Sequence, residues 1–149
     1  METQRLRRWG VAGALVGTLA LGGACGTMDR ARGMQTWTLN TFDSVQAAKG
    51  QVLVGTEKNG NTKVKVEVQH LAPPATVDND SNAYVVWLQP AGGEPQNVGV
   101  LQVGNDLKGE LETRTPFKQF QVIVTAEERP NVRAPSGPPV MNTNITVPS

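Results

Sequence analysis

A strict two-residue alternation is the feature that most constrains how this chain can fold. Between Lys63 and Val68 every second residue is a valine, and the residues between the valines are charged. Such a period places the valines on one face of an extended strand and the charges on the other. Because a strand with one apolar face must bury that face, the segment predicts a β-sheet with a packed core.

Other strand-sized segments follow, bounded by Gly, Pro, Asn or Asp. Asn59 and Gly60 mark a hairpin, since this pair adopts positive φ at low cost. Residues 43–49 suit a single helical turn. The expected strands are residues 37–42, 51–56, 63–68, 83–89, 97–103, 109–113, 117–125 and 140–147. The pattern predicts one all-β domain over residues 37–149, an antiparallel β-sandwich (immunoglobulin-like or barrel-like) of about seven or eight strands.

The first 25 residues have the organisation of a signal peptide. Arg5, Arg7 and Arg8 precede the uncharged, largely apolar residues 10–24, and Cys25 follows. The small residues before Cys25 resemble the bacterial lipobox, in which the cysteine is acylated and becomes the new N-terminus. Residues 26–36 are expected to be a polar tether. The resemblance implies an extracytoplasmic protein, lipid-anchored to the cell membrane, with a soluble periplasmic or secreted protein as the alternative.

Three interpretations of Cys25 stay open: lipidation, cleavage nearby by another peptidase, and an uncleaved membrane anchor. Cys25 is the single cysteine, so no intramolecular disulfide forms. Lipidation is favoured because a free thiol is a liability in an oxidising compartment.

The composition makes nucleic-acid binding, catalysis and metal binding unexpected. Acidic and basic residues nearly balance after the N-terminal segment, so no nucleic-acid binding is expected. His70 is the single histidine, so we expect no catalytic triad, no metal site and no cofactor, and we predict that the protein is not an enzyme. Asp78, Asp80 and Asn82 alternate like the start of a calcium loop, but they lack its glycine and distal glutamate.

An ordered set of segments resembles the extracytoplasmic C-terminal domain of the anti-sigma-K factor family. The segments are 84–88 (Tyr-Val-Val-Trp-Leu), 97–101 (Asn-Val-Gly-Val-Leu), 120–127 (Phe-Gln-Val-Ile-Val-Thr-Ala-Glu) and the 135–138 turn (Pro-Ser-Gly-Pro). The resemblance implies a β-rich fold outside the membrane and a role in sensing or partner binding. At most about nine residues precede the apolar run, so we expect the family's cytoplasmic sigma-binding domain to be missing.

The positions that carry this resemblance are interpreted as core or structural residues. Gly99 is expected at a bulge or a close backbone approach, and core packing is favoured over a ligand groove for the two aromatic residues of segment 84–88. Glu127, Glu128 and Arg129 are expected to form a solvated strand end. The full set is Tyr84, Trp87, Leu88, Gly99, Phe120, Thr125, Glu127 and Gly137.

The leading functional hypothesis is a non-catalytic envelope protein that senses envelope state or binds a protein partner. The alternative is a structural accessory of an envelope assembly without a signalling role. A hydrolase is the third class, and it would require polar residues to converge around His70.

Overall fold

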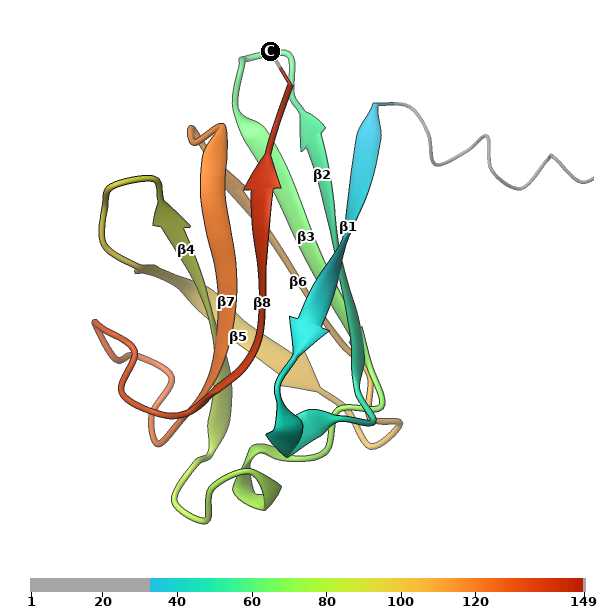
Figure 1. Ribbon diagram of the computed structural model, residues 1–149, viewed down its shortest axis with the longest axis vertical. Helices are drawn as coiled ribbons and strands as arrows, with labels where there is room; N and C mark the ends of the chain where they lie inside the picture. The colour runs from blue at the N-terminus through green and yellow to red at the C-terminus, as the bar shows by residue number, and fades with distance from the viewer. Residues whose placement is uncertain (1–32, 149) are drawn as a thin grey trace, which may run out of the picture. The chain divides into compact units, whose positions relative to one another are not determined.

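The computed structural model describes residues 33–148, which form eight antiparallel strands and two short 3₁₀ turns (Figure 1). The strands are β1 (Met34–Thr41), β2 (Lys49–Thr56), β3 (Thr62–Gln69), β4 (Ala83–Pro90), β5 (Gln96–Val103), β6 (Gly109–Thr115), β7 (Gln119–Glu127) and β8 (Pro139–Thr146). The turns are η3 (Asp43–Val45) and η4 (Pro74–Thr76). The predicted signal peptide, Cys25 and residues 26–32 of the tether lie outside the described residues.

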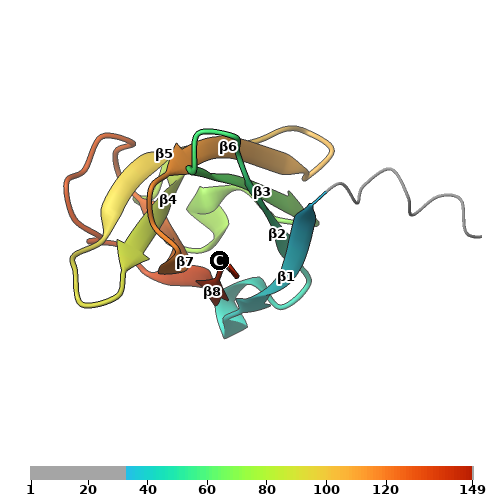
Figure 2. The same cartoon turned by 90° about the horizontal axis from the view of Figure 1, so that it is seen from above.

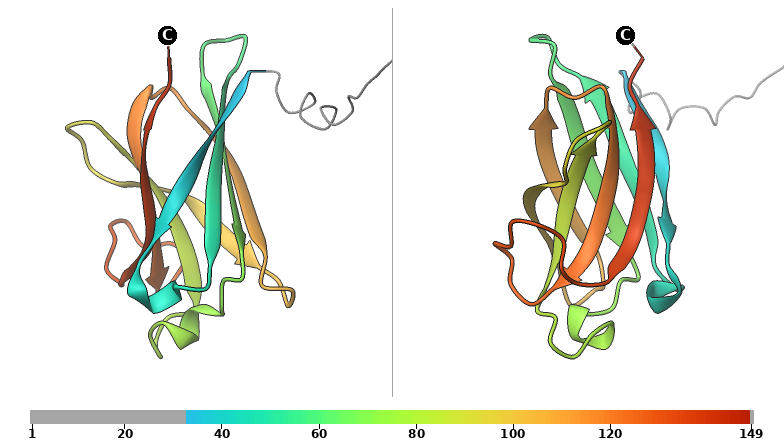
Figure 3. Two further views of the ribbon diagram at one scale, coloured as in Figure 1. Left: turned by 45° about the vertical axis from the view of Figure 1, so that its right-hand side comes forward. Right: turned by 60° about the vertical axis from the view of Figure 1, so that its left-hand side comes forward.

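The strands close into a barrel in the order β1-β2-β3-β6-β5-β4-β7-β8, seen end-on in Figure 2. At two places the barrel is closed by only two pairs of residues. Strands β1 and β8 share only the pairs Asn40–Asn142 and Thr41–Met141, and β5 and β6 pair only beside their common turn. Figure 3 shows β5 and β6 diverging from that turn. The molecule is therefore a barrel made of two four-stranded sheets that meet at two short seams.

Alternation along the strands builds the interior. The valines of β3, Val64, Val66 and Val68, are at most 2% exposed, as the sequence pattern requires. Apolar residues of all eight strands contribute to the same core. The barrel is thus filled by its own side chains, as expected at this strand number. Within residues 33–148, no helix is long and apolar enough to cross a membrane.

The predicted strands correspond to the observed ones, with shifts at their ends. The largest shift is at β1, which begins at Met34, so the predicted tether extends too far. Met34, Gln35 and Thr36 pair with Gly55, Val54 and Leu53 of β2. These residues form a strand despite their polar composition because they pair with β2. The helical segment expected at 43–49 is limited to the η3 turn.

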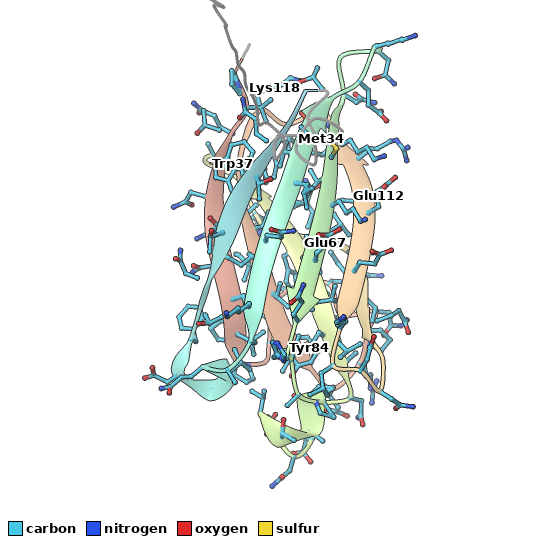
Figure 4. All side chains as sticks on the ribbon, turned by 90° about the vertical axis from the view of Figure 1, so that its right-hand side faces the viewer. Met34, Trp37, Glu67, Tyr84, Glu112 and Lys118 are labelled. Atoms are coloured by element: carbon cyan, nitrogen blue, oxygen red, sulfur yellow. The ribbon has the colours of Figure 1, made fainter. Side chains whose placement is uncertain are left out.

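The outer faces of the two sheets differ in charge. Strands β3 and β6 carry a ladder of ion pairs that includes Lys63–Glu112 at 3.2 Å and Lys65–Glu67 at 2.9 Å; Glu67 and Glu112 are labelled on this face in Figure 4. Strands β5, β4, β7 and β8 of the other sheet contain a single charged residue, Glu127. That carboxylate therefore requires a specific explanation.

Candidate functional site

Part of the outer face of β4 and β7 is buried, although alternation directs it away from the barrel core. Tyr84, Val86 and Leu88 of β4 point into the core, so Trp87 lies on the opposite face and is absent from the core cluster. Trp87 is nevertheless fully buried, and so is Glu127 at the end of β7. A second layer must therefore cover this part of the sheet.

The segment that covers it is the connection between β7 and β8, residues 128–138, which we call the outer loop. In Figures 1 and 2 it lies outside the barrel beside β4, β5 and β7. The side-chain amide of Asn97 donates to the carbonyl oxygens of Pro130 at 3.0 Å and Val132 at 2.9 Å. Since Asn97 is the register partner of Trp87, these bonds hold the loop beside the tryptophan.

Glu127 fixes the other end of the outer loop. Its Oε1 accepts from Thr125 Oγ1 at 2.6 Å and from the Ser136 backbone N–H at 3.0 Å. Its Oε2 accepts from Ser136 Oγ at 2.6 Å and from the Gly137 backbone N–H at 2.9 Å. Every buried polar side-chain atom in the described part of the chain has a partner. Both carboxylate oxygens are thus satisfied by neutral donors, three of them in the loop.

The network continues from Glu127 into the sheet. Trp87 Nε1 donates a hydrogen bond to Thr125 Oγ1 at 2.8 Å, and the Thr125 hydroxyl donates in turn to Glu127 Oε1. The hydroxyl of Thr125 therefore acts as acceptor and donor at once, so its proton and one of its lone pairs are both used in the buried site. The result is one hydrogen-bonded chain from β4 through β7 to the outer loop.

Gly137 makes the close approach of the loop possible. A Cβ added at this position would overlap the carbonyl oxygen of Ala126 and lie 3.4 Å from Glu127 Oε2. The next residue accepts a backbone hydrogen bond, from Ala126 N to the Pro138 carbonyl, at 3.0 Å. Glycine is required here by the contact between two backbone segments and a buried carboxylate.

Two opposing effects act on the charge of Glu127. Burial raises the pKa of its carboxyl, but the hydrogen bonds from Ser136, Thr125 and Gly137 outweigh burial and hold the pKa below its ordinary value. Glu127 is therefore ionised near neutral pH. Because its oxygens are occupied by these donors, the carboxylate is a structural acceptor and not a base open to a substrate.

The expectation of a solvated end at Glu127 is wrong, although Glu128 and Arg129 are exposed as expected. Glu127 is buried because it shares the outer face with Trp87 and because a downstream loop folds back over both residues. Because Glu127 lies two residues after Thr125 in the same strand, the sequence alternation alone could have assigned both residues to the same face. The return of Ser136 and Gly137 depends on a tertiary contact that no local pattern encodes.

The remaining residues of the predicted set serve the barrel. Tyr84, Leu88 and Phe120 are in the core, and the Tyr84 hydroxyl donates to the Ala72 carbonyl at 2.6 Å. Burial raises the pKa of Tyr84 to about 12. Gly99, with φ of 140°, stands at the register shift between β4 and β5, at the kind of bulge expected for it.

His70 stands alone at the end of β3. It is exposed, adopts a left-handed backbone with φ of 57°, and forms no side-chain hydrogen bond within the described residues. Asp78 and Asp80 lie in a turn closed by bonds from Ser81 and Asn82. Among residues 33–148, no group of three His, Cys, Asp or Glu side chains is placed to hold a metal ion.

Neither family models nor curated proteins provide a relative from which a role can be transferred. No family model matches the chain, and no curated protein matches it. The site must therefore be interpreted from its own geometry.

Proposed function

We propose that this chain is an exported, lipid-anchored bacterial envelope protein whose barrel binds a protein partner, without catalysis, through the outer loop. The observation that carries the proposal is the way this loop is held. The half-buried amide of Asn97 holds the first flank at Pro130 and Val132. The buried carboxylate of Glu127 holds the second flank at Ser136 and Gly137. The tip between these flanks is exposed.

A loop held in this manner is suited to recognition. Binding to a flexible loop loses affinity to the entropy of ordering it, whereas a loop ordered beforehand avoids most of that cost. Recognition residues are often carried on loops that a rigid scaffold positions. The tip presents the cation of Arg133 and the apolar surface of Ala134 and Pro135, and the exposed amide of Asn131 lies next to it in the first flank. The partner is therefore expected to offer a mixed polar and apolar surface.

Site-specific photocrosslinking in intact cells tests the binding surface. A photoreactive residue at Ala134 should give a discrete adduct with one protein, whereas the same residue at Lys63, on the charged outer face, should not. Equal labelling at both positions, or no adduct at Ala134, would contradict the proposal.

The anchor is tested separately by cell fractionation. Wild type should sediment with membranes, and Cys25→Ser should move to the soluble extracytoplasmic fraction. Ser44→Ala, a change at an exposed serine of η3, serves as the control. Retention of Cys25→Ser in the membrane would refute lipid anchoring but leave the role of the outer loop open.

A further inference from the structure

We propose that Glu127 is an acid-sensitive latch: protonation of its carboxylate releases the outer loop from the sheet and uncovers Trp87 while the barrel stays folded. The inference concerns the loop itself and stands whether or not the loop binds a partner. It follows from the direction of the hydrogen bonds, the origin of the donors and the surface beneath the loop.

The Glu127 carboxylate is the acceptor in each of its hydrogen bonds. The Ser136 N–H donates to Oε1 and the Gly137 N–H donates to Oε2, and neither group can accept. Whichever oxygen gains a proton therefore becomes a poorer acceptor for one of these two amides. The Ser136 hydroxyl can rotate, but the two amides cannot. Three of the four donors belong to the outer loop, and the fourth, Thr125, belongs to the barrel. Protonation therefore weakens mainly the bonds that attach the loop.

Nothing around the carboxylate compensates for that loss. The groups that bond to it, from β7 and from the loop, are neutral. The adjacent turn, which donates Asn82 N–H to the Glu127 carbonyl, contains the acidic residues Asp78 and Asp80. Glu128 and Arg129 follow in the chain, are exposed, and pair with one another at 3.8 Å. Arg133 lies at the exposed tip of the loop.

The core and the strand pairing of the barrel do not use the Glu127 carboxylate. Strand β7 pairs with β4 from Phe120 to Glu127 and with β8 from Gln119 to Thr125, and the core lies on the other side of the sheet from Glu127. Release of the loop would uncover the fully buried Val85 and Trp87 on the outer face of β4, beside the half-buried Ile123 of β7, the register partner of Trp87. Apolar area that reaches water only after acidification makes this a conformational switch.

The test uses the full chain with Trp9→Phe and Trp37→Phe, so that Trp87 is the only tryptophan. Its fluorescence emission and the far-ultraviolet circular dichroism of the barrel are recorded as the pH is lowered. We expect a red shift of the Trp87 emission at a higher pH than the loss of the β signal. A red shift that coincides with the loss of the β signal would overturn the proposal.

Three variants separate a latch from a merely stabilising residue. Glu127→Gln should show the red-shifted emission already at neutral pH, and trypsin should cut it after Arg133 at least about tenfold faster than wild type. Ser136→Ala keeps the carboxylate but removes one donor, so its transition should move to higher pH. Glu128→Gln, the exposed neighbour, should behave like wild type.

The same variants also give the results that would contradict the latch. If Glu127→Gln keeps the wild-type emission and resists trypsin at Arg133, the carboxylate does not hold the loop. If Glu127→Gln fails to fold, Ser136→Ala decides, because its change lies at the exposed side of the loop. An unchanged transition in Ser136→Ala would then refute the latch.

Discussion

Glu127 and Gly137 show how single residues can determine the position of a whole segment. Glu127 provides the acceptors, and Gly137 provides the space in which the loop backbone can reach them. Neither residue contributes apolar area to the core. Their importance lies in the position of the outer loop, so substitutions at these two sites should be disproportionately harmful.

Gly137→Ala tests the steric requirement. The new methyl group would overlap the Ala126 carbonyl, so the loop must shift and strain the end of β7. We expect a loss of unfolding free energy of about 1–3 kcal/mol, the usual range for overpacking. Urea unfolding measures it. Gly104→Ala is the matched control, since its methyl group would meet only the flexible side chain of Asp106. Equal losses in the two variants would show that Gly137 has no special role.

Glu127 should make stability depend on pH in one direction. Its folded-state pKa lies below the unfolded value, so the stabilisation is complete above the unfolded pKa and is lost as the pH falls through the folded pKa. Near neutral pH, Glu127→Gln should cost about 1.5–3 kcal/mol of unfolding free energy. Urea unfolding of both proteins over a pH series should show this difference shrinking in acid. A difference that is constant with pH would contradict the assignment.

Tyr84 can be observed directly because it is the only tyrosine in the chain. Burial raises its pKa to about 12, so the tyrosinate absorbance should appear about two pH units above that of a free tyrosine. The raised pKa means that stability is complete below the unfolded pKa and falls as the pH rises toward the folded pKa. A tyrosinate midpoint near that of a free tyrosine in the folded protein would show that the hydroxyl is not buried.

At the scale of elements, the two seams are the least supported parts of the barrel. At the β5–β6 seam, Leu111 fills the space left where the strands diverge, and its side chain lies against Gly99. A bulge at Gly99 lets β5 bend away from β6 and still pair with β4. Side-chain packing therefore replaces the missing strand pairing at this seam.

Leu111→Ala should accordingly destabilise the barrel. Leu111 is partly buried against the core, so we expect a loss of about 1–3 kcal/mol in unfolding free energy, below that of a fully buried leucine. Leu107→Ala is the control, because Leu107 is 37% exposed at the tip of the same hairpin. Thermal or urea unfolding distinguishes the two variants. A larger loss for Leu107→Ala would contradict the role given to Leu111.

The strands could be predicted from the sequence because their signals are local. The alternation from Lys63 to Val68 and the turn at Asn59 and Gly60 depend only on neighbouring residues. Closure through Asn40 and Asn142 joins residues far apart in the chain, and no periodicity predicts it. For the same reason Trp87, Thr125, Glu127 and Gly137 could be selected one by one, but their common network could not.

At the scale of the whole molecule, the asymmetry of the two outer faces is the organising fact. The outer face of β3 and β6 carries partly exposed ion pairs, which contribute little to stability and keep the surface solvated. The opposite sheet carries no charge except Glu127, and part of it is covered by the outer loop. We therefore propose that the recognition surface lies on the loop side of the barrel.

The central claim is that the outer loop binds a partner in the conformation that Glu127 maintains. The most direct measurement is the yield of the Ala134 photocrosslinked adduct in cells that express wild type, Glu127→Gln or Glu128→Gln at equal levels. We expect a large loss of the adduct in Glu127→Gln and none in Glu128→Gln. Equal yields in all three proteins would contradict it.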